Sequence, residues 1–344
     1  MKSIVVNAKA CQMARSVALV FCLTLTVTAA IPGGLPQDKA PAKDQPQVSD
    51  GERKAVEKIN AAKDAESKMK AAVEFIKKNA KSSLRPRVAA YVADELSRGQ
   101  NPQQVLSLSQ TFISTFNLPE EGDLVRPGMI DALIKLEKWD DALNESRQYL
   151  QRNPEDVTVM ISIAWAGATL VQKQASNPKM LQAATESSAK AVELMELDKR
   201  PSRFDEKGWG EYRNSWLPRL YQARGLMLLT TNRSESKDNL EKAAGLEPYD
   251  PSTLMMLVNI TNEEYQDIAK KYQTEKKSEL LDKAVEKMDE VIDWMARAVG
   301  ATEGIAQMQQ VNQQLRENLQ AYYGFRHDGK TDGMAGLIEK YKKK

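Results

Sequence analysis

Aromatic side chains interleaved with basic ones form the part of the sequence best suited to binding chemistry. The aromatic set is Phe204, Trp209, Tyr212, Trp216 and Tyr221, and the basic set is Arg200, Arg203, Lys207, Arg213 and Arg219. Trp, Tyr and Arg carry much of the binding energy at many interfaces, so segment 204–221 could bind a glycan, a small molecule or an acidic peptide. The alternative is a loop folded back onto the protein, in which the rings fill a gap between packed elements.

Catalytic and metal-binding chemistry has few candidate residues. The chain has one histidine, His327, and two cysteines, Cys11 and Cys22, both in a leader that we expect to be removed. Metal sites with His and Cys ligands and nucleophiles activated by His are therefore not expected. Carboxylate pairs such as Asp140-Asp141 stand at predicted helix starts, where acids complement the helix dipole. Catalysis by carboxylates alone is the remaining enzymatic alternative, but the sequence predicts a protein that is not an enzyme and has no cofactor or metal.

The N-terminus has the three parts of a secretory signal peptide. Basic residues come first, an apolar run covers 17–27, and the small-residue sequence Thr28-Ala29-Ala30 follows. This order predicts a signal peptide over 1–30, cleaved after Ala29 or Ala30. A retained membrane anchor is the alternative, although the run is shorter than the ~20 residues that span a bilayer. We therefore expect a periplasmic or secreted protein with no integral membrane span after cleavage.

Charge and composition restrict the class of partner. The chain has 49 basic and 47 acidic residues, and removing the 3 basic residues of the leader leaves 46 against 47, a net charge of −1. Proteins that bind nucleic acid normally carry a basic excess, so no nucleic-acid partner is expected. Segment 31–51 is rich in Pro, Gly, Gln, Asp and Lys, and its composition predicts a disordered tether.

The body of the chain shows helical periodicity and no long stretch that alternates with period two, so an all-α fold is expected. Segment 200–218 contains Gly208, Gly210 and Pro218 and shows no clear helical period, which predicts a long insertion. The predicted parts are N-terminal helical hairpins over 52–118, repeated hairpins over 119–300 with an aromatic insertion at 200–218, and capping helices over 301–344.

A recurring spacing of small residues and proline marks the repeated hairpins. In the clearest copy, Met129 to Pro154, Ala142 precedes the proline by twelve residues and lies within Lys138-Trp139-Asp140-Asp141-Ala142-Leu143. Weaker copies carry part of the signal; their residues are Gly225, Ser236 and Pro248 in one, and Ala184 and Ala191 in the other. Small residues let two antiparallel helices approach closely, and proline ends the second helix. These copies resemble the tetratricopeptide repeat, and the chain more loosely resembles secreted bacterial tetratricopeptide-like proteins.

The resemblance implies an α-solenoid of stacked antiparallel hairpins, in which the first helix of each hairpin lines a concave groove for a protein or peptide partner. By the register of the family, groove-facing residues include Asp131, Lys135, Trp165 and Gln222. The Lys and Asn residues with which chaperone-binding members clamp a terminal carboxylate are missing. We therefore expect a non-catalytic interaction scaffold. Its partner-binding candidates are Trp165, Asp131, Lys135, Gln222, Trp209, Tyr212 and Trp216, and the alternative is a glycan-binding or small-molecule-binding protein that uses 204–221.

Overall fold

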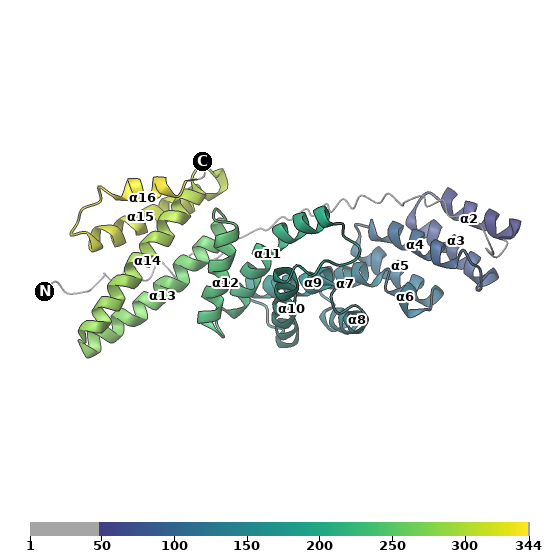
Figure 1. The fold of residues 1–344 in the computed structure, drawn as a ribbon, viewed down its shortest axis with the longest axis horizontal. Helices are drawn as coiled ribbons and strands as arrows, with labels where there is room; N and C mark the ends of the chain where they lie inside the picture. Colours follow the sequence, from purple (N-terminus) through teal and green to yellow (C-terminus); the bar gives the residue numbers. More distant parts are fainter. Residues whose placement is uncertain (1–47, 343–344) are drawn as a thin grey trace. The chain divides into compact units, whose positions relative to one another are not determined.

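The computed structural model describes residues 48–342, which fold into α-helices with one short 3-10 helix and no strand (Figure 1). The helices are α2 (Asp50–Ala61), α3 (Ala65–Lys78), α4 (Arg85–Ser97), α5 (Pro102–Thr115), α6 (Pro119–Gly122), α7 (Arg126–Lys135), α8 (Trp139–Arg152), α9 (Val157–Gln172), α10 (Pro178–Glu196), α11 (Glu206–Leu228), α12 (Arg233–Leu246), α13 (Pro251–Glu275), α14 (Ser278–Thr302), η1 (Ala306–Met308), α15 (Gln309–Arg326) and α16 (Met334–Lys340).

The described chain divides into two compact units, and the boundary falls within α9, between Ser162 and Ile163. In the unit of residues 48–162, α2 packs on α3, α5 on α7, and α7 on α8. In the unit of residues 163–342, α10 packs on α11, α11 on α12, α13 on α14, and α14 on α15. Helices pack mainly against their chain neighbours, so the predicted all-α fold of helical hairpins is confirmed.

Side-chain caps set where several helices begin. The predicted tether ended at Gly51, but α2 begins at Asp50, because Ser49 and Glu52 form a reciprocal capping box. The Ser49 hydroxyl accepts from the Glu52 N–H at 3.3 Å, and the Glu52 carboxylate accepts from the Ser49 N–H at 2.9 Å. Asn101 caps α5, accepting from two backbone N–H groups. The predicted signal peptide and the tether up to residue 47 lie outside the described residues.

Four of the described helices end in the same kind of turn, in which one residue has a left-handed backbone conformation. Glu137, Gln174, Asp198 and Asp328 have φ of 56°, 54°, 53° and 55°. After each of them, a backbone N–H bonds back to the carbonyl five residues earlier, at 2.9 Å in the first three turns and 2.7 Å in the fourth. Such bonds satisfy carbonyls that the helix end leaves open and turn the chain sharply. The turn recurs at the ends of α7, α9, α10 and α15.

Small residues lie where paired helices approach most closely. A Cβ added to Gly167 on α9 would come within 2.2 Å of the Ala184 Cβ on α10 and 2.8 Å of the Met227 Sδ on α11. At Gly225 on α11, the added atom would lie 2.6 Å from the Leu240 Cγ on α12. The Ser236 hydroxyl donates to the Gly225 carbonyl at 2.7 Å. The small positions predicted at Ala184, Gly225 and Ser236 are thus close helix contacts.

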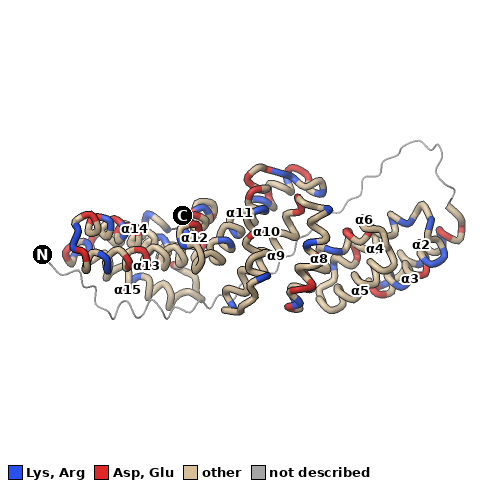
Figure 2. Tube along the Cα trace, turned by 90° about the horizontal axis from the view of Figure 1, so that it is seen from below, with Lys and Arg blue, Asp and Glu red and all other residues tan. Residues whose placement is uncertain are grey.

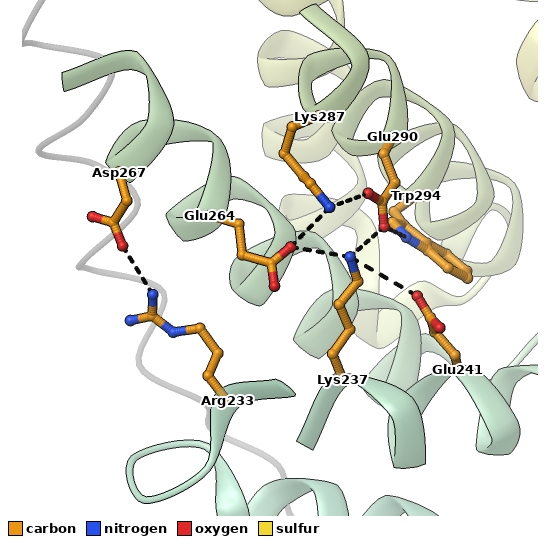
Figure 3. Close-up of polar contacts among 8 residues, drawn as sticks. All are labelled: Arg233, Lys237, Glu241, Glu264, Asp267, Lys287, Glu290 and Trp294. Carbon is orange, nitrogen blue, oxygen red and sulfur yellow. Dashed lines mark hydrogen bonds and ion pairs between the residues drawn. The ribbon is translucent and has the colours of Figure 1, made fainter. Parts of the chain in front are cut away.

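A closed ring of alternating charges joins α12 to α13 and α14. Its members are Lys237, Glu264, Lys287 and Glu290 (Figure 3). The Lys237 Nζ lies 3.0 Å from Glu264 and 2.5 Å from Glu290. The Lys287 Nζ lies 3.0 Å from Glu264 and 2.6 Å from Glu290. We call these four residues the charge ring. Elsewhere, basic and acidic residues are interspersed in both units (Figure 2).

The predicted insertion is wrong from residue 206 onward. The segment forms the first half of α11, a helix of 23 residues that runs on through Pro218. Asp205 caps its start by accepting from the Gly208 N–H at 2.6 Å, so Gly208 stands in the first turn, where a side chain would crowd the cap. Pro218 has no N–H to offer the Asn214 carbonyl, which removes one helical hydrogen bond without ending the helix. The non-helical connection is therefore limited to residues 197–205.

Candidate functional site

The aromatic residues singled out by the sequence line one side of α11. Trp209, Tyr212 and Trp216 are spaced three and four residues apart, which places them on one helical face. Ring centroids lie 6.3 Å apart between Trp209 and Tyr212, and 6.1 Å apart between Tyr212 and Trp216. Trp165 on α9 meets Trp216 edge to face, with centroids 6.2 Å apart and planes at 88°. The helical form of 206–218 therefore joins two sequence candidates, Trp165 and the aromatic segment, into one surface.

Phe204 and Trp209, at the start of the aromatic segment, form a packing element. Trp209 is only 3% exposed, and its indole N–H donates to the Asp198 Oδ1 at 2.8 Å. Phe204 covers it, with centroids 5.7 Å from Trp209 and 4.9 Å from Tyr212. Asp198 is the left-handed residue after α10, so this bond fixes the start of α11 to the end of α10. For Phe204 and Trp209, the interpretation as a folded-back packing element is the better one.

Trp216, at the other end of the aromatic face of α11, and its neighbour Trp165 stay partly open to solvent. Trp165 and Trp216 are both half-buried. Unlike Trp209, neither indole N–H has a hydrogen-bond acceptor among the described residues. The Arg219 guanidinium lies over the Trp216 ring, with its Cζ 5.5 Å from the centroid. We call Trp165, Trp216 and Arg219 the Trp165–Trp216 surface. Its edge-to-face rings offer apolar contact area together with unused donors, the combination found at binding hot spots.

The last aromatic residue of the segment, Tyr221, lines a different concavity, of about 660 Å³, between α10, α11 and α12. Its hydroxyl bonds to Glu196, and the Lys242 ammonium lies 5.2 Å from its ring centroid. Burial, followed by the bond to Glu196, raises the pKa of the Tyr221 phenol well above its ordinary value. Arg224, in the same wall, pairs with Glu235. These polar groups satisfy one another, and Tyr221 is not part of the Trp165–Trp216 surface.

The remaining predicted residues lie elsewhere. The Gln222 amide donates to the Asp250 carboxylate at 2.7 Å and to the Thr253 hydroxyl at 2.9 Å, so it ties α11 to the capped start of α13. Asp131 and Lys135 are exposed on α7, in the unit of residues 48–162. Sequence reasoning noted Arg219 among the interleaved basic residues but did not include it in the site. Its spacing of three from Trp216 would have pointed to it once the segment was recognised as helical.

Residues 48–342 contain no group of three or more His, Cys, Asp or Glu side chains placed to hold a metal ion. No helix within them combines the length and the apolar character that a membrane crossing requires.

No protein-family model matches the sequence, and no curated protein matches it. Among solved structures, the chain is similar to a tetratricopeptide repeat protein from Parabacteroides merdae, at 13% identity over 83% of this chain and 95% of that chain, with a TM-score of 0.35.

Proposed function

We propose that this protein is a non-catalytic scaffold that binds a protein or peptide partner through the Trp165–Trp216 surface. The observation that carries the proposal is the edge-to-face pair of half-buried indoles, contributed by two helices, whose N–H donors have no acceptor among the described residues. A partner that covers the pair would bury apolar area and could accept hydrogen bonds from both donors. Helical repeats leave an extended surface of this kind free for binding.

The glycan or small-molecule alternative from 204–221 has weaker support. Sugar stacking requires an open aromatic face, and Phe204, Trp209 and Tyr212 lie against one another with centroids 4.9 to 6.3 Å apart. Rings that contact each other in this way leave less open face for a sugar.

We further propose that the protein acts in the periplasm or outside the cell, on the strength of the predicted signal peptide over 1–30.

The test compares partner binding and folding in the same variants. Trp165→Ala and Trp216→Ala should each weaken partner binding by about 2 kcal/mol, roughly 30-fold. Because both side chains are only half-buried, the free energy of unfolding should fall by less than the roughly 3–5 kcal/mol typical of a core Trp. Phe325→Ala is the matched control, since Phe325 is an exposed aromatic residue on α15, 44% exposed, and it should leave binding unchanged.

Partners would be captured from the native envelope fraction and then assayed by titration against each purified variant. A partner whose affinity is the same for the parent, Trp165→Ala and Trp216→Ala would show that this surface is not the binding site.

The compartment is tested by N-terminal sequencing of the protein from its native host, which should give Ala30 or Ile31 as the first residue. An intact Met1 would contradict the proposed compartment.

A further inference from the structure

The charge around the Trp165–Trp216 surface is basic on the side of α11 that carries Trp216. Arg213, Trp216 and Arg219 are spaced three residues apart, so all three side chains lie within about a third of the helix circumference. The aromatic ring thus has a guanidinium on each side along the helix. This arrangement favours a partner that carries acidic groups.

The Arg219 guanidinium has not been neutralised by the fold. No carboxylate among the described residues is within ion-pairing distance of it. Its field reaches Glu247, where it partly offsets the rise in pKa that burial and Asp250 cause, but the two groups form no ion pair. By contrast, Arg224 pairs with Glu235 on the next helix. Arg219 is half-buried, so its positive charge is held in place beside the indole rather than extended into bulk water.

Arg213 is only loosely paired. Its Nη1 lies 3.5 Å from the Asp198 Oδ1, which already accepts the Trp209 N–H at 2.8 Å. The Arg213 Nε is buried and has no hydrogen-bond partner. A partner cannot reach this buried atom, but the side chain as a whole is 34% exposed, so a second carboxylate could pair with the terminal N–H groups of the guanidinium.

We propose, building on the proposed function, that the partner presents an acidic peptide segment to this surface. An apolar side chain of the peptide packs on the Trp165–Trp216 pair, and a neighbouring carboxylate pairs with Arg219. The planar guanidinium matches a carboxylate with two parallel N–H···O bonds. The indole N–H groups donate to main-chain carbonyls of the peptide, which an extended segment exposes. The second arginine, Arg213, favours a further acid along the same segment.

The experiment uses a phage-displayed library of random 12-residue peptides as the probe. Selection on the purified protein is followed by counter-selection on the Trp165→Ala/Trp216→Ala double variant, which removes peptides that bind elsewhere. Circular dichroism melting first establishes that the double variant is folded at the selection temperature. If it is not, the two single variants replace it in the counter-selection. The enriched peptides are then synthesised and their affinities measured by titration at low and high salt.

We expect the enriched peptides to carry Asp or Glu next to a bulky apolar residue. Arg219→Gln should weaken their binding about tenfold or more, as loss of a charge-assisted bidentate contact does. Binding to the parent should weaken as salt is raised. Arg219→Glu should reverse the preference, so that a peptide with Lys in place of the acid binds better than the original. Lys207→Gln is the matched control, because Lys207 is 86% exposed on the same helix, nine residues and so half a turn around from Trp216, and it should leave affinity within about twofold.

Two results would overturn the inference and are distinguishable. Peptides that depend on both tryptophans, show no enrichment of acids and bind Arg219→Glu as well as the parent would contradict the acidic partner and leave the proposed binding surface standing. A library that yields no peptide preferring the parent over the tryptophan variants would count against the proposed function as well.

Discussion

Substitution of Lys237 by Met tests whether the charge ring holds α12 onto α13 and α14. Met keeps the apolar stem of the side chain and removes only its ammonium group. In the parent, two lysines, Lys237 and Lys287, face three carboxylates, those of Glu241, Glu264 and Glu290, which is a net local charge of −1 (Figure 3). The variant raises this imbalance to −2 and leaves Lys287 as the one cation of the ring.

The expected cost follows from burial. Removing one partner of a fully buried ion pair costs about 3–5 kcal/mol, whereas exposed pairs contribute about 0–1 kcal/mol. The Lys237 side chain is 12% exposed, and those of Glu264 and Glu290 are 24% and 30% exposed, so the ring stands between these limits. We expect Lys237→Met to lower the free energy of unfolding by about 2 kcal/mol. The control, Lys190→Met on α10, breaks a pair that is 48% and 53% exposed and should cost less than about 0.5 kcal/mol.

The pH dependence has a definite sign. Burial raises the pKa of Glu290, but the hydrogen bonds from Lys237 and Lys287 outweigh it, so the pKa lies below the ordinary value of a glutamate. Burial lowers the pKa of Lys287, but hydrogen bonds to Glu290 and Glu264 outweigh it, so the pKa lies above that of an ordinary lysine. Stabilisation by Glu290 is present above about pH 4.5 and is lost as pH falls through its lowered pKa; that of Lys287 is present below about pH 10.4 and is lost as pH rises through its raised pKa. The difference between parent and variant should therefore be largest between these limits and shrink in acid.

The assay is urea denaturation, because urea, unlike guanidinium chloride, does not screen charge. Since repeat arrays can lose two-state behaviour, hydrogen exchange of the α12 and α13 amides would locate the loss. Equal small losses in Lys237→Met and Lys190→Met, or a difference that does not change between neutral and acid pH, would refute the reasoning.

Three further predictions concern packing. Gly167→Ala should destabilise by about 1–3 kcal/mol, because the added Cβ meets Ala184 at 2.2 Å; Gly245→Ala, with nothing within 4 Å of its added Cβ, should instead stabilise by up to about 1 kcal/mol, and thermal melts with the same sign for both would contradict this. Ala142→Leu should cost about 1–3 kcal/mol because Ala142 is 1% exposed, whereas exposed Gln148→Ala should be nearly neutral; a loss below ~0.5 kcal/mol in urea would mean that the repeat register is wrong. Trp209→Phe should cost about 1 kcal/mol, because it removes the hydrogen bond from the indole N–H to Asp198, whose carboxylate is 65% exposed and can be solvated instead. The substitution should leave peptide affinity unchanged; a tenfold loss of affinity without loss of stability would place Trp209 in the binding site.

Local patterns predicted the helices where local chemistry decides them. Asn101 marks the start of α5 because its side chain accepts hydrogen bonds from the N–H groups of Gln103 and Gln104, which follow it closely in the sequence. The small residues Gly225 and Ser236 marked a helix contact because only small side chains fit where two backbones meet. The failure at α11 has an equally local cause. Gly208, Gly210 and Pro218 are residue types that often break helices and so predict an insertion, although the spacing of Trp209, Tyr212 and Trp216 fits one helical face.

Contacts between helices could not be predicted in the same way. Trp165 and Trp216 were separate candidates in the sequence, and nothing in either neighbourhood states that α9 brings the first against the second. The charge ring is a similar case, because Lys237 finds Glu264 and Glu290 on two other helices. The partner of a long side chain depends on where other helices lie, and this is set by the packing of the whole unit rather than by local periodicity.

The packed aromatic residues at the start of the segment help to hold Trp216 in place for binding. Phe204 and buried Trp209 fix the first turns of α11 against the end of α10 through Asp198. Tyr212 then holds Trp216 from one side, and Trp165 holds it from α9. A ring held in this way has lost most of its rotamer freedom before a partner arrives, so binding costs less ordering entropy. The packing interpretation and the binding interpretation of 204–221, alternatives at the level of sequence, therefore apply to successive residues of a single helix.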